Sequence, residues 1–434
     1  MTEAVSILAR AVGSLRRRSK PKSRVTFVGA STMTKGGMRS RFFAIMSRLD
    51  AFGLRPPRPL LIWLNRLYQG YRRHIVWQWQ AGLAQLEVVQ VRTLRQRRPV
   101  LGLREFATLG RGWTVSVEER SHRRFLEYTV EYPGNLQSFP PPFICRLESA
   151  FVHVPSGGVI GSGGVVIAES TGFKVERFVA MGRPPEDLAA RPGSYTTILY
   201  SLHRNYYHWM IDCLPRTYLL SKLQDRGPVG LLIPPGLAPF QHLTLKCCLP
   251  ENVQPFEVNV DWVRAEQLVL PSFAAEPNNG SLPSECLNYI RGKVFQHLGL
   301  TDVARTRRRI YVSRARTAWR RILNEPEVIE TLAKFGFEAV RPEELSFEEQ
   351  VKMFHSAEAV VGARGAGLTN MIFSKDLRIL ELTGTRPFVG VAYFSLARAM
   401  AHQYHYVFST PVGHDFRVDL RALEKAIFEM GLSG

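Results

Sequence analysis

The fold is decided by the stretch E-A-V-V-G-A-R-G-A-G-L-T-N, residues 358–370. Its apolar start predicts a short buried strand running into the glycines, and Leu368–Phe373 predicts the first turns of a helix. Glycines let the backbone approach a ligand closely, and a helix N-terminus offers unpaired N–H groups and a partial positive charge. The stretch therefore predicts an anion site. An ordinary tight strand-to-helix turn is the open alternative, since neither a G-x-G-x-x-G pattern nor a P-loop lysine is present.

The flanking sequence alternates between strand and helix patterns. One helix is predicted to start at Asn324, as N-cap with Glu327 as its partner, and another at Ser346, with Glu349 as its partner. Strands are predicted at 310–312, 337–340 and 378–382. This alternation favours a parallel, doubly wound sheet.

Charged residues follow the predicted strands of this sheet. Arg314 and Arg316 come after the first strand, Arg364 lies in the glycine stretch, and Glu381 ends the last strand. Ligands of such sheets bind beyond the carboxyl ends of the strands. Two arginines and a helix start suit a diphosphate, and a carboxylate suits ribose hydroxyls.

A second group of polar residues is S-L-H-R-N-Y-Y-H-W-M-I-D-C-L-P-R, residues 201–216. The spacing becomes helical from Tyr206, so His208 and Asp212 face the same side of the chain. A histidine oriented by a carboxylate can take a hydroxyl proton near neutral pH. A surface or capping pair is one alternative. A metal site is another, disfavoured because no third ligand is near.

In their order along the chain, these patterns resemble glycosyltransferase family 61. The likeness rests on N-Y-Y-H-W-M-I-D-C-L-P-R, Y-V-S-R with a following N-E, L-S-F-E-E-Q-V and V-V-G-A-R-G-A-G-L-T-N-M-I-F, and it spans about residues 140–410. The family includes bacterial capsular-polysaccharide glycosyltransferases. The resemblance implies an α/β fold of GT-B type, with two facing Rossmann-like domains. It also implies a nucleotide diphosphate sugar as donor, a glycan or lipid-linked glycan as acceptor, inversion at the anomeric carbon, and no metal or other cofactor.

The resemblance assigns site residues by their positions in these patterns. His208 and Asp212 are the catalytic candidates. Arg364 departs from the family, which usually has histidine there; arginine can bind anions but does not exchange a proton. Donor binding is expected from Arg314, Arg316, Arg364, Gly365, Ala366, Gly367, Thr369, Asn370 and Glu381, and acceptor or cleft contacts from Asn205, Tyr207 and Arg216.

We expect four parts in the chain. Residues 1–110 form a basic, mostly helical extension, and residues 111–285 form a Rossmann-like acceptor domain with a β-rich start. Residues 286–410 form a Rossmann-like domain for the nucleotide sugar, and residues 411–434 form a C-terminal helix.

Composition supports an intracellular enzyme. Five cysteines form no C-x-x-C pair, and no secretory signal is evident, which favours a reducing cytoplasm. No D-x-D triplet occurs, which argues against the metal-dependent class of nucleotide-sugar transferases.

The charge is concentrated at the start of the chain. The net charge is +20, and residues 1–130 hold 25 Lys and Arg against 7 Asp and Glu, a balance of +18. Residues 60–98 mix this charge with tryptophans, and the apolar run at 60–64 is too short to span a membrane. We therefore predict that residues 1–110 bind an anionic membrane surface, at the inner face of the plasma membrane, or a partner protein. A plain solvated face is the alternative. Nucleic acid ranks last because no nucleic-acid motif accompanies the charge.

A non-catalytic function stays open beside the enzyme. A nucleotide- or glycan-binding scaffold within a polysaccharide assembly complex would explain the arginine at position 364. Retention of His208, Asp212, Arg216 and Glu381 speaks for the enzyme.

Overall fold

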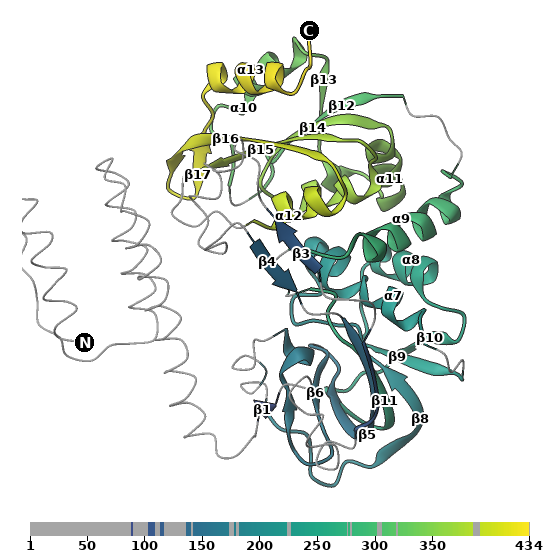
Figure 1. Cartoon of the computed structure of the whole chain (residues 1–434). Helices are drawn as coiled ribbons and strands as arrows, with labels where there is room; N and C mark the ends of the chain where they lie inside the picture. The colour runs from purple at the N-terminus through teal and green to yellow at the C-terminus, as the bar shows by residue number, and fades with distance from the viewer. Residues whose placement is uncertain are drawn as a thin grey trace, which may run out of the picture. The chain divides into compact units, whose positions relative to one another are not determined.

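The structure is a computed structural model. It describes residues 142–172, 178, 182–223, 227–275, 277, 280–301, 306–317, 320–384 and 391–433, together with the backbone of strands at 88–89, 103–108, 113–116 and 136–139. All of these lie in one compact unit of the chain. Two sheets organise it, one drawn in blue to teal and one in green to yellow (Figure 1).

The first sheet is mixed. Four neighbouring strands, β11, β8, β9 and β10, run parallel, and β5 pairs antiparallel with β11. Outside the sheet, β3 (Trp113–Ser116) pairs only with β4 (Leu136–Phe139) among the described strands. The spatial order is β1 (Val88–Val89), β7 (Val166–Ile167), β6 (Gly158–Ile160), β5 (Phe143–His153), β11 (Trp262–Pro271), β8 (Ala190–Thr196), β9 (Val229–Ile233), β10 (Val253–Glu257), with β2 (Leu103–Thr108) also on β5.

Helical crossovers connect the parallel strands of this sheet. Between β8 and β9 the chain passes through α6 (Tyr206–His208) and α7 (Arg216–Leu220), and between β9 and β10 through α8 (Pro239–Cys248). This part agrees with the Rossmann-like expectation, because parallel neighbours require such crossovers. The antiparallel strands β5, β6 and β7 lie in the part of the chain where a β-rich start is predicted.

Two short stretches within the predicted, mostly helical extension form strands. Residues 88–89 and 103–108 are the strands β1 and β2 of the first sheet rather than parts of a helical extension. Val88 and Val89 are β-branched, a residue type that suits strands. The rest of residues 1–110 lies outside the described residues.

The second sheet is doubly wound, as predicted. Its first five strands are parallel and β17 closes the edge antiparallel to β16. In chain order the parallel strands stand 2-1-3-4-5, so the winding reverses between β12 and β14. The spatial order is β13 (Phe337–Val340), β12 (Arg308–Val312), β14 (Ala357–Ala363), β15 (Arg378–Gly384), β16 (Gln403–Val412), β17 (Asp415–Arg417).

Helices cover this sheet, and one of the two predicted caps is confirmed. Ser346 and Glu349 form the expected capping box. Asn324 does not cap its helix: it is buried, and its amide exchanges two hydrogen bonds with the Val418 backbone. The helices are α9 (Ser284–Leu298), α10 (Glu325–Ala333), α11 (Phe347–His355), α12 (Ala392–Ala399) and α13 (Leu420–Glu429). The last lies within the predicted C-terminal helix at 411–434, whose first residues instead end β16 and form β17.

The segment after the glycine stretch differs from the prediction. It is a 3-10 helix, η7 (Ala366–Phe373), instead of an α-helix. Every residue from Leu368 to Phe373 is buried, so packing on all sides sets the winding rather than an amphipathic period.

The largest hydrophobic core joins the two sheets. It contains Leu231 of β9, Ile290 of α9 and Ile379 of β15 in one continuous cluster. Helix α9 therefore packs with both halves of the described chain, the first half built around the first sheet and the second half around the second sheet. Among the described residues, none of the helices combines the length and the apolar character that crossing a membrane requires.

Candidate active site

The first group of site residues lies on an irregular helix after β8. Asn205 is the N-cap of this helix, and its side-chain oxygen accepts a hydrogen bond from the backbone N–H of His208 at 3.4 Å. From Trp209 to Cys213 the winding widens to a π-helix, and the Trp209 indole fixes it by donating to Thr244 Oγ1 at 2.9 Å. Short π segments are frequent at functional sites.

The predicted pair of His208 and Asp212 is formed. His208 Nδ1 lies 2.6 Å from Asp212 Oδ2, and the two side chains are 13% and 4% exposed. A carboxylate only accepts hydrogen bonds, so the Nδ1–H of His208 is the donor, and in the neutral imidazole Nε2 carries the lone pair. The rings of Tyr200 and Tyr207 flank the imidazole at 5.6 and 5.4 Å between centroids. This geometry suits a general base.

Arg216 has a different role from the predicted acceptor contact. It is fully buried, and its guanidinium donates to the carbonyls of Pro271 and Leu199 at 2.6–3.1 Å. The Phe273 ring lies 4.6 Å from the guanidinium carbon. Burial lowers the pKa of Arg216 to about 10. Arg216 therefore braces the end of β11 against the segment after β8, without a surface for a ligand.

The second group lies where the winding of the second sheet reverses. Arg314 follows β12 and Gly365 follows β14, and the two meet: a Cβ added to Gly365 would lie 1.8 Å from Arg314 Nη1. Gly365 has an extended backbone with φ 179°, so its conformation does not demand glycine. The missing Cβ leaves room for the end of the Arg314 side chain. Burial, followed by the charge of Arg320, lowers the pKa of Arg314. A switch point of this kind is where doubly wound sheets bind ligands.

Arg364 turns toward the protein. Its Nη1 is 3.2 Å from Glu381 Oε1, and its guanidinium lies 5.4 Å from the centre of the Tyr393 ring. Glu381 is fully buried and accepts a second hydrogen bond from Tyr404, at 2.8 Å. Burial by itself would lower the pKa of Arg364, but the Glu381 carboxylate raises it. Both residues are thus parts of one internal ionic network, and the predicted ribose contact of Glu381 stays a prediction.

The other predicted donor-binding residues are either exposed or packed inside the protein. Arg316 is 67% exposed and pairs with Glu344 at 2.6 Å. Gly367 is also closely packed, although less so than Gly365, since a Cβ there would lie 2.9 Å from Val312. Thr369 and Asn370 are fully buried in η7, and Ala366 begins it.

One hydrogen bond connects the two groups, and the sequence did not indicate it. The Tyr206 hydroxyl, two residues before His208, donates to Asn370 Oδ1, and Asn370 Nδ2 donates to Gln350 at 2.8 Å. Tyr207 adds an aromatic contact, with its ring 5.6 Å from that of Tyr393. Base candidate and anion site thus belong to one connected structure, although 164 residues separate Tyr206 from Asn370.

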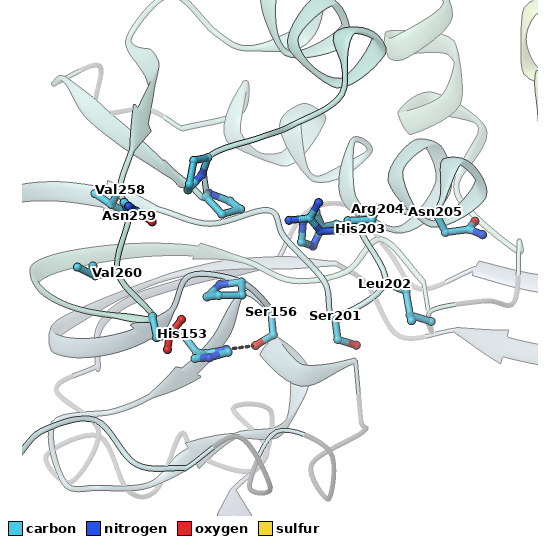
Figure 2. A pocket seen from close by; sticks show the side chains of 14 residues that line it. His153, Ser156, Ser201, Leu202, His203, Arg204, Asn205, Val258, Asn259 and Val260 are labelled. Carbon is cyan, nitrogen blue, oxygen red and sulfur yellow. Dashed lines mark hydrogen bonds between the residues drawn. The ribbon is translucent and has the colours of Figure 1, made fainter.

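A cavity of about 920 Å³ lies beside the first group. Its walls come from the segments that follow β5, β8, β9 and β10, and Asn205 belongs to them (Figure 2). Sequence analysis identified Asn205 as a site residue, and the stretch 201–216 that it singled out also supplies Ser201, Leu202, His203 and Arg204. The lining residues after β5, β9 and β10 gave no local signal in the sequence.

Comparison with known families gives one match. Residues 206–379 match the family model described as Glycosyltransferase 61. The matched segment begins with the helix of His208 and Asp212, and it includes Arg314 and the glycine stretch. No curated protein matches the chain significantly.

Proposed function

We propose that this chain, which belongs to glycosyltransferase family 61 and is a glycosyltransferase, moves a sugar from a nucleotide diphosphate sugar to a glycan with inversion. A glycosyltransferase requires a sugar donor and an acceptor. The identity of the donor as a nucleotide diphosphate sugar is supported by the pairing of Arg314 with the glycine stretch, since cations and close backbone amides suit a diphosphate.

One observation carries the proposal. The His208–Asp212 pair, at 2.6 Å, lies on the helix whose Tyr206 is hydrogen-bonded to η7, the element that follows the glycine stretch. A base and an anion site held in one connected structure are the two groups that a single displacement needs.

The proposed step uses these groups as follows. His208 Nε2 takes the proton of an acceptor hydroxyl while its oxygen attacks the anomeric carbon from the face opposite the diphosphate. The bond from that carbon to the diphosphate oxygen breaks, and its electron pair leaves with the nucleotide diphosphate. Arg314 and the amides of Gly365–Gly367 stabilise the departing charge. Asp212 holds the imidazole and stabilises its protonated form.

The remaining proposals concern metal, fold type and location. We expect Arg314 to replace a divalent cation at the diphosphate, so turnover should survive excess EDTA. A strict requirement for Mg²⁺ or Mn²⁺ would overturn this expectation. The doubly wound second sheet and the parallel strands of the first support a GT-B arrangement.

The basic N-terminal region supports a peripheral position at the cytoplasmic leaflet, in polysaccharide biosynthesis. The full chain should sediment with anionic vesicles at low salt and be released at high salt, and sedimentation that is insensitive to salt would contradict this.

Substitution of the base tests the reaction. With panels of UDP-, GDP- and dTDP-sugars as donors and methyl glycosides as acceptors, H208A and D212N should each lower transfer by about 10²–10⁴-fold. H242A is the matched control, because His242 is an exposed histidine on α8. Full activity of both H208A and D212N on a donor that the wild type uses would refute the base assignment.

A scaffold is the second candidate, and Arg364 favours it. Arginine stands where the resemblance leads us to expect histidine, and it is held in an ion pair with Glu381. Binding of nucleotide diphosphate by the wild-type chain, without hydrolysis or transfer of any donor in the panel, would favour the scaffold over the enzyme.

A further inference from the structure

The 920 Å³ cavity beside Asn205 is lined by polar side chains from several strand ends. Strands β8, β9 and β10 are parallel neighbours, so the segments after them, which carry His203, Pro234 and Asn259, start from one edge of the first sheet. Figure 2 shows these segments around the cavity, with the His153–Ser156 hydrogen bond at its floor. The carboxyl edge of parallel strands is the usual place for a ligand.

His203 defines the chemistry of this cavity. Its Nδ1 lies 2.9 Å from the Tyr200 carbonyl, which only accepts, so Nδ1 carries the hydrogen. Burial lowers the pKa of His203, assisted by the charge of Arg204 and opposed by the Tyr200 hydrogen bond, so the ring is neutral at pH 7. Nε2 is therefore a hydrogen-bond acceptor.

That acceptor has no hydrogen-bond partner within the part of the chain that the structure describes, although His203 is only 4% exposed. Gln241 donates a hydrogen bond to the backbone carbonyl of His203 at 3.0 Å, so the residue that carries the ring is held in place. An unpaired buried acceptor is destabilising, and a ligand that supplies a hydrogen would remove that penalty.

The neighbouring groups point to a ligand that both donates and accepts. The Ser201 hydroxyl is likewise buried without a partner among the described residues. Among the lining residues, Arg204 and Asp261 carry opposite charges, and both side chains are exposed. Pro234 and Val258 add apolar wall, which suits the C–H face of a sugar ring.

We propose that this cavity binds an uncharged sugar unit of the acceptor through its hydroxyl groups. A sugar hydroxyl can donate to His203 Nε2, whereas a phosphate or carboxylate without a hydrogen would face that lone pair with its own. The inference rests on the proposed function. Asn205 connects the two sites, because it caps the helix of His208 and also lines the cavity. The unit bound here is therefore one that precedes the reacting sugar of the acceptor.

Filling the cavity is the first test. Asn259 is an exposed wall residue, so N259W can occupy the space without disturbing the core. E257W is the matched control, since Glu257 is exposed on β10 and is not part of the wall. The probes are the methyl glycosides of glucose, galactose, xylose and N-acetylglucosamine, observed on the full chain by saturation-transfer NMR. We expect binding of at least one to the wild type and to E257W, and a loss of tenfold or more in N259W.

The second test addresses the charge of the ligand. Methyl glucoside and methyl glucuronide differ only at C6, which is a hydroxymethyl group in the first and a carboxylate in the second, and we expect the wild type to bind the neutral glycoside at least tenfold more tightly. H203F removes the acceptor nitrogen while keeping an aromatic ring, and it should weaken binding of the neutral glycoside by about tenfold.

The outcomes separate the cavity from the reaction. If no glycoside binds the wild type, if N259W binds as well as E257W, or if the glucuronide is preferred, the cavity is not a neutral sugar site. Nucleotide diphosphate binding and donor hydrolysis by the wild type report on the proposed function alone. A chain that hydrolyses donors but fails the glycoside tests would thus refute only this inference.

Discussion

The Asp212 carboxylate and the Glu381 carboxylate have similar surroundings but opposite properties. Each is nearly or fully buried, with 4% and 0% of its side chain exposed, and each has one basic partner. Asp212 pairs with a histidine at 2.6 Å, and Glu381 pairs with an arginine at 3.2 Å. Histidine exchanges a proton near neutral pH, whereas arginine does not. The same arrangement therefore supports proton transfer in the first half and a fixed charge in the second.

The remaining contacts of the two carboxylates reinforce this difference. Glu381 also accepts from Tyr404, and Arg364 lies on the Tyr393 ring. Burial, and then the charge of Glu381, raises the pKa of Tyr404 well above its usual value, so this hydroxyl stays a donor. Two partners inside the protein thus satisfy Glu381. The pair in the first half directs its other ring nitrogen to an acceptor hydroxyl, in the reaction proposed above.

Removal of the Glu381 charge should have the largest effect on stability. E381Q leaves Arg364 partly buried without its counter-charge, and breaking such a pair typically costs about 3–5 kcal/mol. We expect the free energy of unfolding of the full chain, measured by urea denaturation, to fall by that order. E338Q is the control: it breaks the exposed Arg308–Glu338 pair, which should cost at most ~1 kcal/mol.

The comparison predicts the reverse for Asp212. D212N should lower activity far more than stability, because the neutral amide still fills the same space beside His208. Equal losses of stability in D212N and E381Q would abolish the distinction between the two carboxylates.

The next effect concerns the anion site at the switch point. G365A places a methyl group where Arg314 Nη1 lies, and the flexible end of that arginine must move away. Loss of one charge-assisted hydrogen bond should weaken nucleotide diphosphate binding by roughly tenfold, measured by calorimetry.

G384A provides the matched control for this substitution. Its added Cβ would meet Phe416 at an ordinary 3.6 Å, so binding should be unchanged. Unchanged affinity in G365A would show that Arg314 does not hold the diphosphate.

Much of the second half could be predicted from the sequence because its signals are local. The strand at 337–340 and the Ser346 capping box follow from periodicity and from residues three apart, and both are observed. Asn324 carried the same local signal for a cap, yet its amide pairs with Val418, which is 94 residues away. Tertiary contacts of that kind leave no trace in a sequence window. The 3-10 winding of η7 is set by packing on all sides and is invisible for the same reason.

The site shows the same limit. The His208–Asp212 pair lies within one turn of chain, so spacing alone predicted it. Arg216 had an equally suggestive position, but its carbonyl partners at 199 and 271 came from other segments and made it a brace. The sequence indicates Tyr206 only as the start of a helix, because its hydrogen bond to Asn370 depends on how the two halves pack.

That bond gives the third prediction, which sharpens the comparison by testing whether the two halves act together. Y206F removes the donor to Asn370 and should cost about 1 kcal/mol of stability. We also expect kcat to fall several-fold with donor KM unchanged, because the base shifts relative to the anion site.

Y289F is the control, since its hydroxyl bonds the Cys248 carbonyl at 2.8 Å without linking to the glycine stretch. It should lose similar stability and keep its kcat. A similar kcat in both variants would make the Tyr206 bond a structural contact only.

The smallest effect should be a dependence of stability on pH that originates in the first half. Burial lowers the pKa of both His153 and His203, with Asp261 opposing the shift at His153. The unfolded chain therefore binds more protons than the folded chain once the pH falls below about 6.5, the ordinary histidine value. Stability from these two residues is present above that pH and is lost on acidification. Arg364 should not contribute there, because arginine keeps its proton. Urea denaturation between pH 7.5 and 5 should show a steeper loss for the wild type than for H203Q, whereas H242Q, at an exposed position, should follow the wild type. Equal slopes in the wild type and H203Q would mean that His203 is not held neutral in the folded chain, and the acceptor nitrogen inferred for the cavity would be lost with it.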